Sequence, residues 1–502
     1  MWDLLSNLAF GVSVAASPQN LMLCLIGALV GTLIGVLPGL GPVATIAMLL
    51  PITYGLPPVG ALIMLAGIYY GAMYGGSTTA ILVNIPGESA SVVTTLDGHQ
   101  MALQGRAGPA LAIAAIGSFF AGCVATVIIA AAAAPLTSVA LMFGPAEYFS
   151  LMVLGLIFAV VLAKGSVVKA IAMILVGLVL SMIGSDLETG AGRLNFNIPE
   201  LADGLGFVVI AMGVFGFSEV LRNLEVSHNR DIVQAKITGL MPTREDLIAA
   251  APAIGRGTIL GSALGILPGG GSVIAAFAAY TLEKKLSKHP ERFGRGAIEG
   301  VAGPETANNA ASQTSFIPLL TLGIPPNPVM ALMVGAMTIH GIVPGPQVMT
   351  KQPDLFWGMI ASMWFGNLML VIINLPLVGL WVRLLRVPYR LLYPLILIVC
   401  CIGVYSVNNA PTDVYLTAAF ALIGYWLVKH DFEPAPMLLG FVLGPLMEEN
   451  LRRAMLIARG DWTVFLTRPI SAGLLIVSAI LLVIALLPMI RKKRDEVFVE
   501  EG

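Results

Sequence analysis

Short runs of hydroxyl and amide side chains lie inside otherwise apolar stretches of this chain. The two clearest runs are Ser77-Thr78-Thr79 and Asn308-Asn309. Hydroxyls and amides can donate hydrogen bonds to an anion without the desolvation cost of a buried lysine or arginine, and their oxygens can bind a small cation. These residue types therefore predict a binding site for a charged solute. The alternative interpretation is hydrogen bonding between neighbouring membrane helices.

Two carboxyl groups accompany these runs. Glu88 ends the segment that begins at Asn84, and Glu305 stands just before Asn308. A carboxylate at the bilayer centre costs about 2.5–3.5 kcal/mol on insertion scales, so it needs a proton, a cation or a cluster of donors. Both carboxyls are therefore candidate ligands for a coupling ion, Na⁺ or H⁺. The alternative is a carboxylate at a helix N-terminus or at the membrane interface.

A repeated glycine-proline motif precedes each polar run. Residues 35–41 read G-V-L-P-G-L-G and residues 265–271 read G-I-L-P-G-G-G, with further glycines at Gly31 and Gly261. Glycine and proline cost a helix interior about 1 and about 3 kcal/mol. Paired interruptions in the two halves of a membrane chain point to a transporter binding site, where unpaired N–H groups can hold an anion and free carbonyls a cation. Close packing of helices through small residues, or a hinge, is the alternative.

The order of elements repeats after each motif. The polar run of the first half leads into Ile85-Pro86, and the polar run of the second half leads into Ile324-Pro325. The halves are not chemically equivalent, because Asn327 stands where the first half has Glu88. Asp97, His99 and Arg106 follow in a more polar segment, which we expect to be a loop and to which we assign no role.

The elements that position these residues are membrane helices. The 502 residues are 57% hydrophobic and 11% charged, with a net charge of −1 and a mean hydropathy of +0.90. This composition excludes an ordinary soluble domain and makes nucleic acid an implausible partner. The four cysteines lack metal-ligand spacing and no nucleotide-binding P-loop occurs, so the sequence indicates no structural metal and no ATP hydrolysis.

The apolar runs predict about 12 crossings with some half-crossing elements. They lie at residues 21–50, 58–84, 108–134, 147–163, 166–183, 204–221, 247–280, 305–342, 356–382, 391–408, 412–428, 435–447 and 470–490. Basic loops flank 247–280 on both sides, whereas 21–50 has no basic flank. Because basic loops favour the cytoplasm, the first break is predicted to enter from outside and the second from inside. The basic segments 452–468 and 491–494 flank one apolar run, so one of them must break this rule.

The chain therefore reads as an all-α polytopic integral membrane protein of two inverted repeats, each with a broken or re-entrant helix. We expect one half at 1–225, the other at 226–469, and a C-terminal helix with a basic tail at 470–502.

The motif set resembles the large membrane subunit of the tripartite tricarboxylate transporters. The residues that carry the resemblance are G-V-L-P-G-L-G-P at 35–42, G-G-S-T-T-A-I-L-V-N-I-P-G-E at 75–88 and P-E-T-A-N-N-A-A at 304–311. The resemblance implies a bacterial inner-membrane permease without enzymatic activity, a small four-helix membrane partner and a periplasmic substrate-binding protein. It also implies that the permease imports organic carboxylates, typified by citrate, with Na⁺ or H⁺.

The resemblance places substrate-binding residues on the breaks and polar runs, with Glu88 and Glu305 as coupling-ion candidates. The substrate-binding candidates are Pro38, Gly39, Gly41, Ser77, Thr78, Thr79, Asn84, Pro86, Gly87, Pro268, Gly269, Gly271, Ser272, Thr306, Asn308, Asn309, Pro325 and Asn327.

The predicted function is binding-protein-dependent uptake of a tricarboxylate or dicarboxylate by cation symport with alternating access. The alternatives are a passive anion channel and, less favoured, an intramembrane enzyme. An enzyme would need a catalytic set, and no histidine adjoins Glu88 or Glu305 in the sequence.

Overall fold

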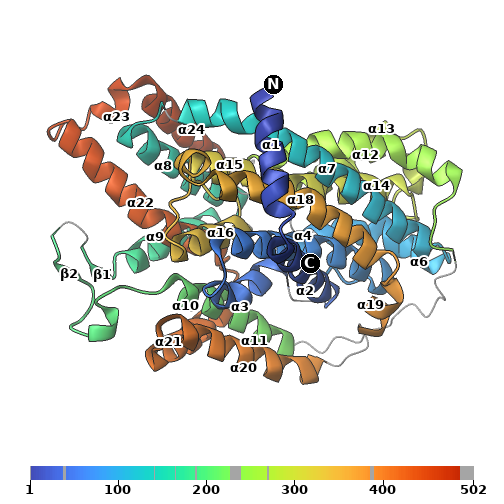
Figure 1. Cartoon of the computed structure of the whole chain (residues 1–502), viewed down its shortest axis with the longest axis horizontal. Helices are drawn as coiled ribbons and strands as arrows, with labels where there is room; N and C mark the ends of the chain where they lie inside the picture. Colours follow the sequence, from blue (N-terminus) through green and yellow to red (C-terminus); the bar gives the residue numbers. More distant parts are fainter. Residues whose placement is uncertain are drawn as a thin grey trace.

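The computed structural model describes residues 2–37, 41–140, 142–163, 166–186, 189–225, 239–267, 271–384 and 389–486. Almost all of the described chain is helical (Figure 1). The first half contains α1 (Trp2–Ala15), α2 (Pro18–Val36), α3 (Pro42–Thr53), α4 (Pro58–Val83), η1 (Ser89–Ser91), α5 (Val92–Thr94), η2 (Thr95–His99), α6 (Gln100–Leu103), α7 (Ala107–Ala140), α8 (Pro145–Leu162), α9 (Val167–Ser181), η3 (Pro199–Leu201), α10 (Phe207–Ala211), η4 (Met212–Phe217) and α11 (Ser218–Glu225).

The second half contains α12 (Arg244–Gly265), α13 (Gly271–Leu286), η5 (Pro290–Arg292), α14 (Glu299–Thr314), α15 (Phe316–Leu322), α16 (Pro328–Ile339), α17 (Gln347–Lys351), α18 (Pro353–Asn374), α19 (Val378–Leu384), α20 (Tyr389–Asn408), α21 (Pro411–Lys429), α22 (Ala435–Ile457), α23 (Val464–Thr467) and α24 (Pro469–Leu486). Two short antiparallel strands, β1 (Gly184–Ser185) and β2 (Gly192–Arg193), pair Gly184 with Arg193.

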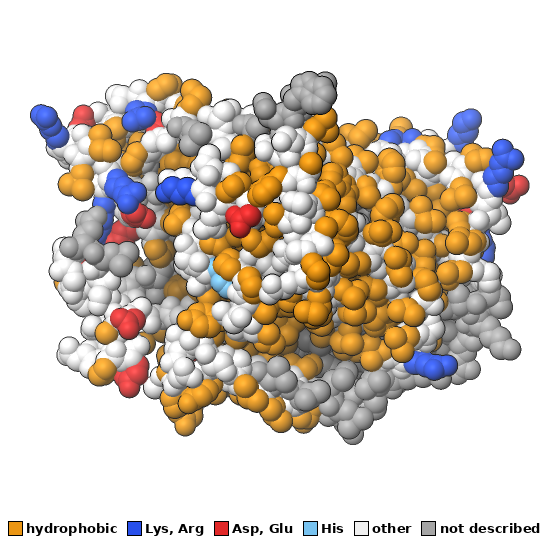
Figure 2. Space-filling view, viewed as in Figure 1, with side chains coloured by type: hydrophobic (Ala, Val, Ile, Leu, Met, Phe, Trp, Pro, Cys, Tyr) orange, Lys and Arg blue, Asp and Glu red, His pale blue; other side chains and the backbone are white. Residues whose placement is uncertain are grey.

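The helices confirm a polytopic all-α membrane protein. Within the described part of the chain, eight helices are long and apolar enough to cross a bilayer, and several shorter apolar helices accompany them. Hydrophobic side chains cover much of the face in Figure 2, whereas lysine and arginine gather toward the ends of the long axis. This is the surface expected of a protein whose middle faces lipid and whose ends face water.

The core of the molecule is built on α4 and α14, which belong to different halves of the chain. In α4 every residue from Gly60 to Val83 is buried, and in α14 every residue from Gly300 to Thr314 is buried. Helix α14 is unusual for a buried helix because small and polar residues make up most of it. A buried polar helix of this kind must pair its polar groups within the protein.

Glycines let a motif helix approach each core helix at backbone distance. A Cβ on Gly31 of α2 would lie 2.3 Å from the carbonyl oxygen of Ile68 in α4. A Cβ on Gly261 of α12 would lie 2.2 Å from the carbonyl oxygen of Ala307 in α14. Both distances are shorter than any tolerated contact, so these glycines serve close helix packing. The packing alternative for Gly31 and Gly261 is therefore confirmed.

The second motif turns the chain back on itself. Arg256 of α12 and Glu283 of α13 are 27 residues apart, yet the Arg256 Nη2 to Glu283 Oε2 distance is 2.5 Å. A continuous helix would separate these residues by about 40 Å at 1.5 Å per residue. Figure 1 shows α12 and α13 running alongside α14 at one end of the molecule. The predicted hairpin over residues 247–280 is therefore confirmed.

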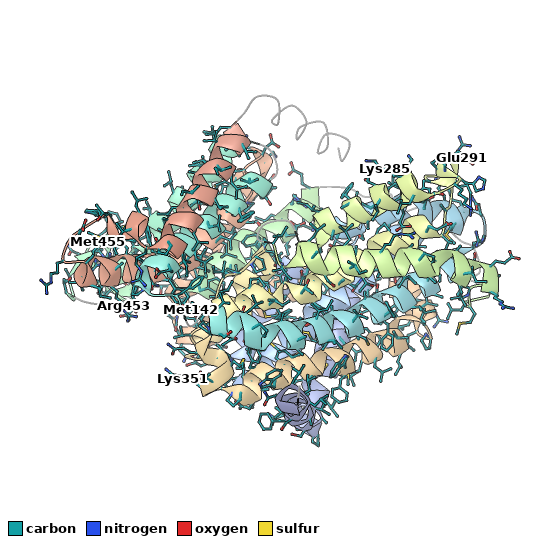
Figure 3. All side chains as sticks on the ribbon, turned by 90° about the horizontal axis from the view of Figure 1, so that it is seen from above. Met142, Lys285, Glu291, Lys351, Arg453 and Met455 are labelled. Carbon is teal, nitrogen blue, oxygen red and sulfur yellow. The ribbon has the colours of Figure 1, made fainter. Side chains whose placement is uncertain are left out.

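Figure 3 separates the basic segments between two ends of the molecule. Lys285 and Glu291 lie at one end, and Lys351, Arg453 and Met455 lie at the other. The segment around Arg453 therefore lies at the opposite end of the molecule from the basic loop that contains Lys285. The basic tail expected at 491–494 lies outside the described residues.

The expectation of a loop around Asp97, His99 and Arg106 was wrong for Asp97 and His99 and correct for Arg106, which lies between α6 and α7. Residues 89–103 form η1, α5, η2 and α6, which are short helical elements that include a π-type turn at Thr95–His99. The polar residues here face buried partners, so their polarity did not indicate exposure to solvent.

Candidate functional site

Glu305 is held by hydroxyl groups from the other half of the chain. The Ser77 hydroxyl of α4 donates to Glu305 Oε2 at 2.5 Å, and the Thr94 hydroxyl of α5 donates to Glu305 Oε1. The Glu305 side chain belongs to α14 and is 1% exposed. Each oxygen of this buried carboxyl therefore has one hydroxyl partner, which offsets part of the cost of burying it.

Glu88 stands at the second break of the first half and is also buried. Its Oε2 accepts the backbone N–H of Ala90 at 2.8 Å and thereby caps η1, and the Ser91 hydroxyl completes a capping box with the Glu88 backbone N–H. Its Oε1 accepts a hydrogen bond from Asn308 Nδ2 of α14 at 3.2 Å. A Cβ on Gly76 would lie 2.9 Å from Glu88 Cγ, so Glu88 packs directly on α4 beside Ser77.

The two carboxyls are bonded reciprocally across the halves of the chain. Glu88 of the first half binds Asn308 of the second, and Glu305 of the second half binds Ser77 and Thr94 of the first. Within the described residues neither carboxyl forms an ion pair with lysine, arginine or histidine. Their charge is therefore balanced by donors alone, and the site can accept a proton or a cation.

A second group of hydroxyls lies beside Glu88 and joins the glycine motif of the second half to the core. The Tyr69 hydroxyl of α4 lies close to the side chains of Ser272, Ser312 and Ser315, and Tyr69 lies close enough to Glu88 for their charges to influence each other. Ser272 is the second residue of α13, directly after the motif. The motif therefore reaches the same polar region as the two carboxyls.

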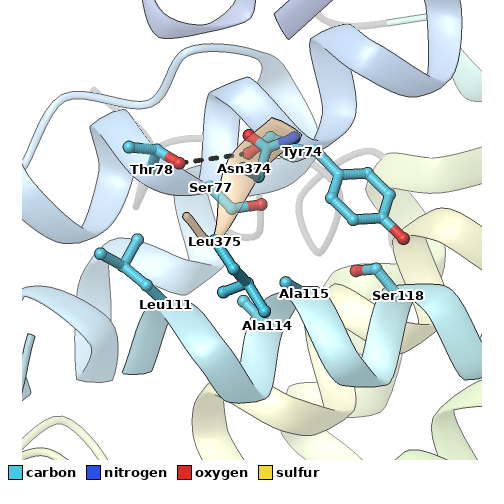
Figure 4. A pocket seen from close by; sticks show the side chains of 9 residues that line it. All are labelled: Tyr74, Ser77, Thr78, Leu111, Ala114, Ala115, Ser118, Asn374 and Leu375. Carbon is cyan, nitrogen blue, oxygen red and sulfur yellow. Dashed lines mark hydrogen bonds between the residues drawn. The ribbon is translucent and has the colours of Figure 1, made fainter. Parts of the chain in front are cut away.

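The polar region extends to a small pocket along α4, which Figure 4 shows. Tyr74, Ser77 and Thr78 of α4 line one side, Ser118 of α7 lies opposite, and Asn374 ends α18 nearby. Asn309 Nδ2 donates to Ser118 Oγ at 2.7 Å and to the Glu305 carbonyl at 2.9 Å. Two of the residues that line the pocket, Ser77 and Ser118, therefore also bond to Glu305 or to its neighbour Asn309.

Several predicted site residues bond to nearby backbone instead of to one another. The Thr78 hydroxyl donates to the Tyr74 carbonyl, as the dashed line in Figure 4 marks, and the Thr306 hydroxyl donates to the Ala302 carbonyl. The Thr79 hydroxyl reaches the Val36 carbonyl at 2.9 Å, where α2 ends. A Cβ on Gly87 would lie 2.2 Å from the Gly35 carbonyl, so the two breaks of the first half touch.

The remaining predicted residues lie at helix ends. Asn84 ends α4 in the left-handed conformation with φ 58°, and Pro86 follows it. Gly41 caps α3, Gly271 begins α13, and a Cβ on Gly271 would lie 3.7 Å from Asn327 Nδ2. Asn327 caps α16 by accepting Met330 N–H, and with Pro326 it lines a second small pocket, next to Pro325. Pro38, Gly39, Pro268 and Gly269 lie outside the described residues.

Asp97 fixes the start of α14 and was not predicted to have a role. Its Oδ1 accepts backbone N–H groups from Gly294, Gly296 and Ala297 at 2.8–2.9 Å, and its Oδ2 accepts the Tyr280 hydroxyl at 3.0 Å. The side chain is fully buried. Because Asp97 follows Thr94 by three residues, one short segment positions both the start of α14 and Glu305.

Sequence reasoning also missed Tyr69, Thr94 and Ser118. Thr94 lies in a run of β-branched residues without a clear period, and Tyr69 and Ser118 stand alone in apolar helices. Only Ser312 carried a local signal, since it lies in the polar stretch that follows Asn308. Within the described residues no cluster of three or more histidine, cysteine, aspartate or glutamate side chains could hold a metal ion.

Buried carboxyls inside a polytopic membrane protein are typical of membrane transporters. Residues 21–439 match the tripartite tricarboxylate transporter TctA family, and the chain belongs to this family. The protein is therefore a transporter permease subunit and works within a tripartite system that includes further subunits.

Two relatives from Agrobacterium vitis cover this chain wholly or in part. One is an uncharacterized 52.8 kDa protein in the TAR-I ttuC' 3' region, 61% identical over 501 residues and covering all of both chains. The other is an uncharacterized protein in the TAR-II ttuC' 3' region, 65% identical over 241 residues, which span 48% of this chain and all of the relative. No solved structure matches the chain.

Proposed function

We propose that this chain is the permease of a bacterial inner-membrane system that imports an organic tricarboxylate or dicarboxylate by cation symport. A small four-helix membrane subunit and a periplasmic substrate-binding protein are its partners. The observation that carries the proposal is the reciprocal bonding of Glu88 with Asn308 and of Glu305 with Ser77 and Thr94 across the two halves. Buried carboxyls paired only with neutral donors are suited to exchanging a coupling ion.

The halves at 1–225 and 226–469 are proposed to be inverted repeats. Matching backbone features after α4 and after α15 support this relation. Asn84 and Gly323 both end their helices with positive φ, at 58° and 76°. Glu88 and Asn327 then cap the next element with φ of −151° in each case. The segment 470–502 would lie outside the repeats.

In the proposed cycle the carboxylate binds between the two motif breaks, near the middle of the membrane. Backbone N–H groups of the breaks and the hydroxyl of Ser272 hold the anion, and a cation binds at a buried carboxyl. One half then moves against the other to open the site to the opposite side, which is alternating access.

The membrane potential constrains the coupling. Moving one negative charge inward against 100 mV costs about 2.3 kcal/mol. A dianion or trianion would therefore need two or three cations for electroneutral transport, and one further cation before the potential favours uptake. A passive anion channel would only equilibrate the solute, and concentrative uptake would exclude it.

Uptake of labelled carboxylates, starting with citrate, tests the proposal. Vesicles would hold this chain with its small partner, with and without the binding protein and with and without an inward Na⁺ gradient. Concentrative uptake that requires both would support the permease and identify the substrate and the cation. Accumulation without Na⁺ would indicate protons, and no flux of any carboxylate would contradict the substrate class.

Single replacements test the candidate binding site for the substrate and the cation. Ser77→Ala, Thr78→Ala and Asn308→Ala would be compared for uptake at equal amounts of protein in the membrane. We expect Ser77→Ala to impair uptake most, because its hydroxyl contacts Glu305. Near-normal uptake with all three variants would contradict this placement of the site.

A further inference from the structure

In the side-chain amide of Asn308, the nitrogen forms a hydrogen bond and the oxygen does not. Its Nδ2 donates to Glu88 Oε1, whereas its Oδ1 has no hydrogen-bond partner among the described residues. The Asn308 side chain is completely buried. Proteins rarely bury an acceptor without a donor, because the oxygen loses its water and gains nothing in return. The oxygen therefore marks a position where a positively charged or donating ligand would be stabilised.

The surroundings of this oxygen favour a cation over an anion. Glu88 is bonded to the same amide, and Glu88 and Glu305 interact electrostatically. The titratable groups that face Glu88 are Glu305 on α14 and Tyr69 on α4. Two neighbouring buried carboxyls repel each other when both are ionised, so a positive charge between Glu88 and Asn308 relieves the repulsion.

The environment of Glu305 differs from that of Glu88. Both oxygens of Glu305 accept hydroxyl donors, and the neighbouring amide of Asn309 binds Ser118 and the Glu305 carbonyl. The unpartnered amide oxygen of Asn374 and the unpartnered hydroxyl of Tyr74 line the small pocket beside Ser77, but neither side chain is bonded to Glu305 among the described residues. Glu305 is therefore a link between α4, α5 and α14, whereas the amide with the free oxygen is bonded to Glu88, which makes Glu88 the better candidate for a cation.

We propose that one monovalent cation binds between the carboxylate of Glu88 and Oδ1 of Asn308. This inference rests on the proposed cation symport and assigns Asn308 to the cation, not to the carboxylate substrate. Carboxylate and amide oxygens are ligands that Na⁺ accepts, and a proton on Glu88 would likewise turn the carboxyl into a donor for Asn308 Oδ1. Both occupants place the same positive charge between the same two side chains.

The test measures cation binding without any carboxylate substrate. The thermal unfolding midpoint of the purified chain would be compared in NaCl and in choline chloride at equal ionic strength, at pH 6 and pH 8. We expect Na⁺ to raise the midpoint of the unaltered protein, because a ligand that binds only the folded state stabilises it. Glu88→Gln and Asn308→Ala would lose this rise. If the occupant is a proton, Na⁺ has no effect and Glu88→Gln removes a pH dependence of the midpoint.

A charge swap keeps the test informative if a single variant misfolds. The double variant Glu88→Gln with Asn308→Asp exchanges the carboxylate and the amide between nearly isosteric side chains. It retains both the charge and the oxygen count, so we expect it to regain the cation effect that Glu88→Gln loses. Asn450→Ala and Glu449→Gln are matched controls, since Asn450 bonds its own helix and Glu449 is exposed beside Arg453, both on α22.

Each outcome separates this inference from the proposed function. An effect of Na⁺ or pH that survives unchanged in Glu88→Gln and Asn308→Ala overturns the inference, as does the absence of either effect in the unaltered protein. Carboxylate uptake in vesicles would then still stand on its own. Conversely, a cation effect lost in both variants, together with no flux of any carboxylate, would support the cation site and contradict the transport proposal.

Discussion

The segments that follow α4 and α15 have similar backbones and different charges. After α4, residues 84–103 contain Glu88 and Asp97, whereas residues 323–340 after α15 contain no acidic residue. Glu88 and Asn327 cap their helices with the same φ and with ψ of 165° and 169°. The backbone thus repeats where the chain must turn, and the charge does not. Glu88 and Asn327 therefore give the two breaks the same backbone geometry. The charge of the capping side chain then determines which ligand each break can bind.

The largest effect in this comparison is expected from Asp97, which has no acidic counterpart after the second break. Asp97→Ala would leave three N–H groups and the Tyr280 hydroxyl without their acceptor. Each hydrogen bond to a charged group contributes about 1.5–3 kcal/mol, so we expect a loss above about 3 kcal/mol, although the bonds are not additive. Thermal unfolding in detergent measures it. A loss below about 1 kcal/mol would contradict the role of Asp97 in fixing α14.

The glycine contacts are the feature that both halves share, and breaking them should affect each half alike. Gly31→Ala and Gly261→Ala each place a Cβ against a backbone carbonyl that cannot rotate away. We expect each to destabilise the protein by about 1–3 kcal/mol. Gly41→Ala is the matched control, because a Cβ there meets nothing within 4 Å and its φ of −75° suits alanine. Equal midpoints for Gly41→Ala and Gly261→Ala would be inconsistent with the close packing.

The ion pair between Arg256 and Glu283 joins the two helices of the second hairpin. Among the described residues, α2 and α3 around the first motif have no such pair. Arg256→Ala would leave Glu283, which is 3% exposed, without its cation. The arginine side chain is 39% exposed, so water screens part of the interaction, and we expect a loss of about 1–2 kcal/mol. Unfolding of Arg256→Ala and Arg256→Lys would be compared. If the lysine variant fully retains stability, a bidentate pair is not required.

The smallest change in stability is expected when the second break is given the same acidic cap as the first. Asn327→Asp gives the second break the acidic cap that the first break has. An aspartate accepts the Met330 N–H as well as an asparagine does, so stability should change by less than about 0.5 kcal/mol. Gradient-driven uptake should fall, because the substituted carboxylate repels the anion, while unfolding stays unchanged. Unchanged uptake would indicate that the substrate does not approach the second break.

Local sequence was sufficient to predict the parts of this protein that depend on periodicity and composition. The apolar runs predicted most helices, and the motif at 265–271 with basic flanks predicted the hairpin that Arg256 and Glu283 confirm. The spacing of Gly31 and Gly35 indicated close helix packing. These features follow from the free-energy cost of glycine, proline and charged residues in a membrane helix. That cost depends on the type of residue and not on its tertiary contacts.

What the sequence determined by itself is therefore the class of fold, the two breaks and the types of side chain available for binding. Only the tertiary structure decided which of them meet. Glu305 finds Thr94, 211 residues away, and Asn308 finds Glu88, 220 residues away. The helical segment at 89–103 and the role of Asp97 also came from packing, because a buried carboxylate is paired by whichever backbone the fold brings to it. No local pattern encodes such a partner, since hydrogen bonds act over about 3 Å in space regardless of distance along the chain.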